Sequence, residues 1–256
     1  MRVTLFGLPV DLLSYDETVE RILAAIAAGK RCQHVALNVA KLVNARTNAE
    51  LDRDIRDSDI VGIDGMGIVY ALRLLGHPLC ERVAGADLFE SLMAECAARG
   101  LRPYLLGATP DVLSAAQLKL AERYPGLALA GSHHGYFTAE QEGTVCDQIR
   151  GSGADCLFIA MPTPRKERFM ARHRDTLGVS FVMGIGGTLD VVAEHVRRAP
   201  ALAQSLGLEW AYRMMQEPRR LAGRYLRTNL IFAGLIVRAL LLQFTGGARH
   251  ARAISE

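Results

Sequence analysis

The sequence predicts an α/β protein in which a doubly wound, mainly parallel sheet of Rossmann-like type is followed by a C-terminal helical appendage. From Arg31 to about Gly187, short apolar runs alternate with amphipathic segments of helical period. A strand–helix–strand repeat of this kind builds a parallel sheet with helices on both faces. After Pro200 the strand pattern ends and only helical spacing continues. We therefore expect a core at 1–196 and an appendage at 197–256.

Local patterns predict each element in turn. Residues 1–22 predict a strand, a turn, a second strand and the start of a helix, and they lack the long apolar run of a signal peptide. The predicted core strands are 34–38, 59–63, 103–107, 127–133, 156–161 and 179–184. Amphipathic segments such as 110–124 separate them and predict helices. In the appendage we expect Pro218 to open a helix, because the first turn does not need the N–H that proline lacks.

The composition limits the class of protein. Half of the residues are apolar and only 22% are charged, so an intrinsically disordered chain is not expected. The five cysteines are scattered and form no CxxC pair. This usage predicts reduced thiols in a cytoplasmic protein and no structural zinc site.

Positive charge is concentrated at the C-terminal end of the chain. From residue 197 onward there are ten arginines, no lysine and three acidic residues, so this part carries +7; because the total is +3, the rest carries −4. An arginine-rich segment favours phosphate, on a lipid headgroup, a nucleic acid or a nucleotide. The apolar run 229–244 is shorter than the roughly 20 residues of a membrane span and contains Arg238. We expect it to lie on a membrane surface rather than to cross the bilayer.

Candidate site residues follow the predicted strands. Ligands of doubly wound sheets bind beyond the carboxyl ends of the strands. The residues found there are Asn38, Asp64, Gly65, Gly107, Thr109, Lys166, Glu167, Gly186 and Gly187. Asp64 ends the apolar run "DIVGI" and precedes a glycine. It could be a turn or helix-capping residue, or a general base that accepts a proton from a hydroxyl.

Other segments also have two interpretations. Thr109 predicts a helix cap, and the N–H groups at the same helix start suit a diphosphate. Arg82 and Asp87 could pair across a turn, or Arg82 could hold a phosphate. In "GIGGTLD" (184–190) Leu189 occupies the place of the third glycine of a dinucleotide loop, so a nicotinamide site is not expected. The two histidines 133 and 134 are expected to be loop residues, since no metal-ligand set surrounds them.

Several segments matter together, in chain order: "FGLPVD", "LNVAKLVNAR", "DIVGIDGMGIVYALRLLG", "RVAGADL", "LLGATPDVL", "GSHHGYF", "GIGGTLDVVAEHVRRAP" and "GLEWAYRMMQEPRRLAGRYLRTN". Over roughly Leu5 to Phe232 they resemble the WecG/TagA/CpsF family of bacterial glycosyltransferases, glycosyltransferase family twenty-six. The last two, together with "DGMGI", are the most specific.

The resemblance implies a metal-independent, inverting transfer from a UDP-sugar to a polyprenyl-diphosphate-linked sugar. The reaction would take place at the cytoplasmic face of the plasma (inner) membrane, to which the protein would bind peripherally, and would need no cofactor. The family's catalytic base falls on Asp64, its donor-site asparagine on Asn38, and its arginine and aspartate on Arg82 and Asp87. The family's appendage touches the membrane and brings arginines over the site, which here would be Arg213, Arg220 and Arg224.

The chain departs from the family pattern at two places. Ala36 stands where the family usually has threonine, and Lys166 stands where it usually has glutamine. Both positions would contact donor or acceptor sugars. The donor is therefore left open between the UDP-N-acetylmannosamine and UDP-glucose types, in the synthesis of an exopolysaccharide or cell-envelope glycan.

Two other classes of function remain as alternatives. One is a nucleotide-binding Rossmann-like oxidoreductase, and the other is a non-catalytic membrane adaptor that uses the basic tail alone. The expected partners are the UDP-sugar, the lipid-linked acceptor and an anionic membrane, and no nucleic acid. The apolar face of 229–244 could also be buried in a second subunit, which would make the protein a homo-oligomer.

Overall fold

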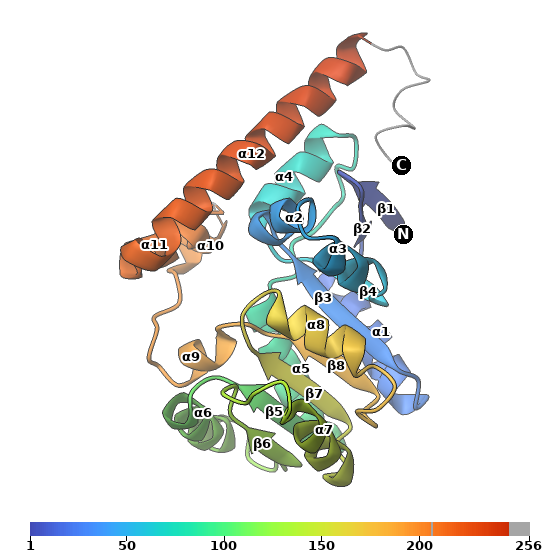
Figure 1. Cartoon of the computed structure of the whole chain (residues 1–256), viewed down its shortest axis with the longest axis vertical. Helices are drawn as coiled ribbons and strands as arrows, with labels where there is room; N and C mark the ends of the chain where they lie inside the picture. Colours follow the sequence, from blue (N-terminus) through green and yellow to red (C-terminus); the bar gives the residue numbers. More distant parts are fainter. Residues whose placement is uncertain (206, 246–256) are drawn as a thin grey trace.

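The structure is a computed structural model and describes residues 1–205 and 207–245, with the backbone alone at positions 201, 205, 220, 244 and 245. Its centre is a parallel sheet of six strands in the order β4-β3-β8-β7-β5-β6 (Figure 1). The strands are β3 (Cys32–Leu37), β4 (Ile60–Ile63), β5 (Pro103–Gly107), β6 (Gly131–His133), β7 (Cys156–Ala160) and β8 (Phe181–Gly184). The predicted Rossmann-like α/β fold is confirmed.

Strand β6 is shorter than the sequence predicts. The strand expected at 127–133 begins only at Gly131. Leu127 and Leu129 instead pack against the apolar cluster on one face of the sheet. Beyond them, β6 is an edge strand that pairs with β5 alone and lies against the ring of Tyr104. The apolar residues that suggested a longer strand therefore cover the core from a loop.

Helices cover both faces of the sheet with separate apolar cores. One face carries α1 (Tyr15–Ala27), α5 (Gly85–Arg99), α6 (Pro110–Arg123) and α9 (Thr188–Val192). The other carries α2 (Val39–Ala45), α3 (Ala49–Arg56), α4 (Met66–Leu74), α7 (Glu142–Gly151) and α8 (Arg165–Arg172). Strand residues alternate between the two cores: Val35 and Leu37 face one and Cys32 faces the other, as the two-residue period of a strand requires.

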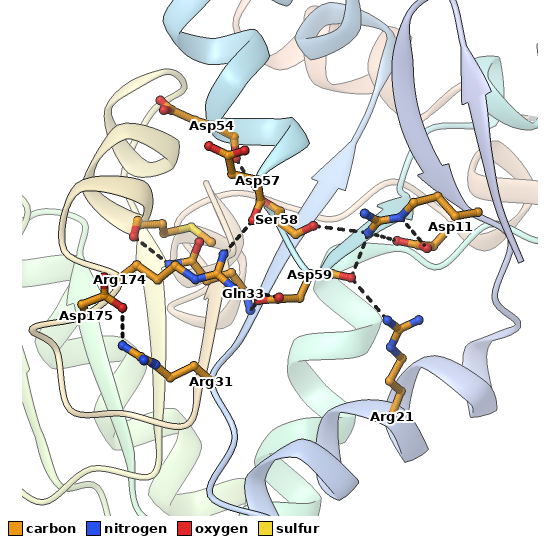
Figure 2. Close-up of polar contacts among 12 residues, drawn as sticks. Asp11, Arg21, Arg31, Gln33, Asp54, Asp57, Ser58, Asp59, Arg174 and Asp175 are labelled. Atoms are coloured by element: carbon orange, nitrogen blue, oxygen red, sulfur yellow. Dashed lines mark hydrogen bonds and ion pairs between the residues drawn. The ribbon is translucent and has the colours of Figure 1, made fainter. Parts of the chain in front are cut away.

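The N-terminal hairpin is joined to the sheet through Asp59. Strands β1 (Arg2–Leu5) and β2 (Leu8–Asp11) pair antiparallel, and α1 follows, as predicted. Asp59 precedes β4; its carboxylate accepts hydrogen bonds from the guanidinium of Arg174 at 2.8 Å and from the backbone N–H of Gln33 at 2.8 Å. Arg2 and Arg21 donate to the backbone oxygen of Asp59 (Figure 2). This carboxylate, at the amino end of the strand, is fully engaged in structural contacts.

The C-terminal part of the described chain is helical. It contains α10 (Ala201–Ser205), α11 (Glu209–Gln216) and α12 (Pro218–Thr245), and Pro218 opens α12 as predicted. Figure 1 shows α12 as one long helix that crosses the end of the molecule formed by α2 and α4. Phe232 is buried there and meets the ring of Phe6 edge-on, with 5.7 Å between ring centroids. The last part of the predicted appendage, 246–256, lies outside the described residues.

Helix α12 is longer than the apolar run that the sequence singled out. Its segment Leu221–Gln243, 23 residues, is long and apolar enough to cross a membrane by length and composition. The expectation that the apolar segment is too short to cross a membrane is therefore wrong. Only 17% of the most apolar window of this segment is buried inside the protein. One face of α12 packs on the core, and most of its surface is free for another contact.

Candidate active site

Asp64 stands where β4 ends, at the carboxyl edge of the sheet. Its backbone N–H donates to the carbonyl oxygen of Leu37 at 3.0 Å, which extends the pairing of β4 with β3 by one residue. One carboxylate oxygen, Oδ1, accepts a hydrogen bond from the backbone N–H of Gly85 at 2.9 Å. In the part of the chain that the structure describes, no group donates to the other oxygen, Oδ2. The half-buried carboxylate is thus held in place through one oxygen, and the other has no described partner.

Asn38 lies next to Asp64 because β3 and β4 are parallel neighbours. It caps α2 by accepting a hydrogen bond from the N–H of Lys41 at 3.0 Å. Gly65 faces it, and a Cβ at Gly65 would lie 3.2 Å from the Cβ of Asn38. The close approach of the two strand ends therefore requires a small residue after Asp64.

Two helices, α4 and α5, begin beside Asp64 without a cap from the residue that precedes them, although the first N–H of α5, that of Gly85, is taken by Asp64 itself. Gly65 precedes α4, and Ala84 precedes α5; neither position supplies a capping hydrogen bond. By contrast, Asn38 caps α2 and Thr109 caps α6. Uncapped helix starts leave N–H groups and the positive end of the helix dipole free for an anion. The surroundings of Asp64 are suited to a negatively charged ligand.

Arg82 and Asp87 both form ion pairs with the C-terminal segment, rather than with each other. Arg82 donates from Nε to the carbonyl oxygen of Asp64 at 2.7 Å and from a terminal nitrogen to the carboxylate of Glu209, at the start of α11. Asp87, in the first turn of α5, pairs with Arg198. The expected alternative, a pair across a turn, is not what the structure has.

A buried charged network lies beside these residues. Glu167 Oε1 accepts from the ammonium groups of Lys41 and Lys166, each at 2.9 Å, and from the hydroxyl of Thr163 at 3.1 Å. Lys41 also donates to the carbonyl oxygen of Ala36 at 2.6 Å, and Lys166 to the hydroxyl of Thr163. The network joins the carboxyl ends of β3 and β7, and its three charged side chains are at least nine-tenths buried.

Burial and nearby charge together lower the pKa values of both Glu167 and Lys166, which favours the ionised carboxylate but weakens the preference of the lysine for its charged form. Burial would raise the pKa of Glu167, but the ammonium groups of Lys41 and Lys166 outweigh it and lower the pKa to about 2. Burial lowers the pKa of Lys166 to about 8, and the nearby Lys41 adds to that effect. The stem of Lys166 passes over Gly184, where a Cβ would lie 2.8 Å from its Cδ. The lysine is therefore confined at the end of β8.

His34 is fully buried beneath this edge. Neither ring nitrogen has a hydrogen-bond partner in the described structure. Its ring fills the space above Gly62, where a Cβ would lie 2.6 Å from Nε2. Burial, together with the positive charge of Lys41, lowers the pKa of His34 to about 4, so the imidazole is neutral at pH 7.

Comparison with known families decides the class of protein. A family model described as "Glycosyl transferase WecG/TagA/CpsF family" matches residues 3–245. The chain belongs to this family. It is therefore a glycosyltransferase. Because ligands of doubly wound sheets bind at the carboxyl edge of the sheet, the site described above is its candidate active site.

The other predicted residues of this glycosyltransferase divide between the two halves of the sheet edge. Gly186 and Gly187 follow β8, next to β3, and belong to the neighbourhood of Asn38. Gly107 ends β5 and Thr109 follows it; strands β3, β8 and β7 separate β5 from β4. Gly107 has φ +125°, and a Cβ there would lie 2.4 Å from the carbonyl oxygen of Ala160. No described contact joins Gly107 or Thr109 to Asp64.

Two of the three predicted appendage arginines can be located by their side chains. Arg213, in α11, lies over the glycine turn after β8; a Cβ at Gly187 would be 4.0 Å from its terminal nitrogen. Arg224 is exposed on α12 and lies over the ring of Tyr225, with its guanidinium carbon 5.0 Å from the ring centroid. The side chain of Arg220 lies outside the described structure. Arg213 is thus nearer to the site than Arg224 in this conformation.

The sequence interpretation missed several residues at this site. Lys41 and His34 could have been noticed as a charged and a titratable residue within apolar patterns. Glu209 and Arg198 carried no such signal, because their partners are far away in the sequence. In the described ranges 1–205 and 207–245, no group of three or more His, Cys, Asp or Glu side chains could hold a metal ion.

Proposed function

We propose that this glycosyltransferase moves a hexose or N-acetylhexosamine from a UDP-sugar to a polyprenyl-diphosphate-linked sugar, with inversion and without a metal. The donor would be of the UDP-N-acetylmannosamine or UDP-glucose type. The product would enter an exopolysaccharide or a cell-envelope glycan. Membership of the family supports the transferase class over an oxidoreductase or a non-catalytic adaptor.

The observation that supports this mechanism is the hydrogen bonding of the Asp64 carboxylate. Its Oδ1 is fixed by the N–H of Gly85, while Oδ2 has no described donor. In the proposed reaction the acceptor hydroxyl attacks the anomeric carbon of the donor. The bond between that carbon and the UDP oxygen breaks, and UDP leaves with the bonding electrons. The proton of the hydroxyl passes to the carboxylate of Asp64, which acts as general base.

Developing charge on the leaving diphosphate needs positive partners. The first turns of α4 and α5 offer the N–H groups that Asp64 does not take, and Arg82 offers a guanidinium next to Asp64. Arg213, Arg220 and Arg224 are proposed to add charge from the appendage. Asn38, Gly65, Gly186 and Gly187 would line the donor or acceptor sugar, and Lys166 and Glu167 would border it. Gly107, Thr109 and Asp87 are proposed as more distant binding residues.

Helix α12 supports a peripheral position on the cytoplasmic face of the membrane. Its exposed residues include the apolar side chains Leu226, Leu230, Ile231, Val237, Leu241 and Leu242, together with Arg219, Arg224, Arg227 and Arg238. Its other face is fixed to the core by Phe232. A helix that crossed the bilayer would have to leave this packing and carry its arginines into lipid, which is costly. Residues 197–256 are proposed as the membrane-binding unit; burial of the same face in a second subunit is the alternative.

Substitution of Asp64 by asparagine tests the mechanism. The amide oxygen can still accept from Gly85, so we expect an unchanged Kd for UDP and a loss of transfer by about 10²- to 10⁴-fold. Transfer is measured to a short synthetic lipid-diphosphate sugar, after a panel of UDP-sugars has identified the donor by thermal stabilisation. Asp111→Asn, an exposed aspartate on α6, is the control. Full turnover by Asp64→Asn would remove Asp64 from the role of base.

A further inference from the structure

Two ion pairs among the described residues connect the core to the C-terminal segment, and both involve residues expected to serve the donor. Arg82 pairs with Glu209, and Asp87 pairs with Arg198. The two pairs have opposite polarity, because the core supplies the cation in one and the anion in the other. Arg82 and Glu209 are 17% and 22% exposed, so water screens their charges only partly.

The hydrogen bonds of Arg82 leave little room for a phosphate. A guanidinium binds a phosphate best through two neighbouring N–H groups. In Arg82, Nε is taken by the carbonyl oxygen of Asp64 and Nη2 by the carboxylate of Glu209. A diphosphate that approached the same edge would meet a second negative charge within contact distance. Glu209 and the diphosphate therefore cannot both occupy Arg82 favourably.

Helix α11 is short and lies near the surface. It has eight residues, none of them fully buried, and no side chain caps its start. A short helix with few buried apolar contacts opens at low cost. Its Arg213 lies one helical turn after Glu209, so both point to the same side, and it reaches the glycine turn at Gly187. If Glu209 moved away from Arg82, its negative charge would leave this place and the positive charge of Arg213 would remain there.

We propose that Glu209 is an internal ligand of Arg82 that the donor diphosphate displaces, so that donor binding releases the start of α11 and leaves Arg213 at the diphosphate. The proposal rests on the UDP-sugar donor proposed above. Glu209 would hold the empty site closed against other anions, and the pair of Asp87 with Arg198 would keep the segment attached while α11 moves.

Substitution of Glu209 by glutamine tests the competition in the full chain. Glutamine keeps the shape of the side chain but not its charge, so UDP should bind about tenfold more tightly in titration calorimetry, which is roughly 1.4 kcal/mol. Glu95→Gln is the matched control, because it removes one carboxylate and one Arg–Glu pair, with Arg99, at an exposed site on α5. A Kd equal to that of the unaltered protein, or a weaker one, would overturn the proposal, since Glu209 would then be neutral or would position Arg82.

The single tryptophan reports the second half of the proposal. Trp210 follows Glu209 directly and meets the ring of Tyr225, with 5.9 Å between centroids. UDP should change its fluorescence in the unaltered protein, and Glu209→Gln should show the changed spectrum before UDP is added. UDP binding that leaves the Trp210 spectrum as it was would overturn the displacement of α11. If UDP bound to neither protein, the proposed donor class would fail, and this proposal with it.

Discussion

Replacing Glu167 by glutamine would test how much the buried network contributes to folding. The carboxylate is the shared partner of Lys41 and Lys166, each at 2.9 Å, and no described group donates to its second oxygen. Removing the charge would leave two buried ammonium groups side by side. Breaking a buried ion pair by removing one partner is strongly destabilising, because the remaining charge has lost its partner.

The pKa of Glu167 gives the magnitude and its pH dependence. A folded-state value of about 2, against 4.5 for the free side chain, corresponds to about 3 kcal/mol of stability. Because the folded pKa is the lower one, this stability is fully present above pH 4.5 and is lost as the pH falls toward 2. We expect Glu167→Gln to lower the free energy of unfolding by about 3 kcal/mol at pH 7 and by about half as much at pH 3.

Urea unfolding of both proteins at several pH values measures this difference. Glu95→Gln, which breaks an exposed pair on α5, should cost at most about 0.5 kcal/mol at any pH. A loss below about 1 kcal/mol at pH 7 for Glu167→Gln would refute the reasoning. A loss that is as large at pH 3 as at pH 7 would also refute it, since the effect would then not come from the charge.

Two further predictions concern packing and membrane binding. Gly62→Ala should lower the free energy of unfolding by about 1–3 kcal/mol, because its methyl group meets the buried ring of His34. Gly143→Ala, with open space in α7, should raise the free energy of unfolding by about 0.5–1 kcal/mol. Equal urea midpoints for the two variants would contradict this. Arg224→Ala with Arg227→Ala should weaken sedimentation with anionic vesicles by about fivefold for each arginine, unlike Arg53→Ala on α3. Unchanged binding at low salt would exclude these arginines from the lipid surface.

Local patterns in the sequence were sufficient for much of the fold. Strand β5 coincides with the predicted 103–107, because a short apolar run bounded by turn residues is typical of a buried strand. Asn38 and Asp64 could be placed together, because the ends of parallel strands share one edge of the sheet. Their catalytic and binding roles stay predictions, as does the boundary at 196.

The strand order and the pairing of charges could not be predicted in the same way. Strand β8 lies beside β3 only because the chain crosses the sheet and returns, and no periodicity encodes this path. Lys41 with Glu167, and Arg82 with Glu209, are each separated by more than a hundred residues along the chain. Such contacts depend on the assembled topology. The start of α12 at Pro218 was predicted, but its apolar segment was taken as 229–244, because the arginines of the first turns concealed that it extends from Leu221 to Gln243.

Four glycines around the proposed base have a consequence for protein engineering. Gly62, Gly65, Gly67 and Gly85 each lie against a side chain from the segment 34–39, namely His34, Asn38, Val39 and Ala36. The backbone around Asp64 therefore fits closely against the segment 34–39. A graft that aimed to exchange sugar specificity between relatives would have to transfer both stretches together, as one interlocking part, or redesign each contact in turn.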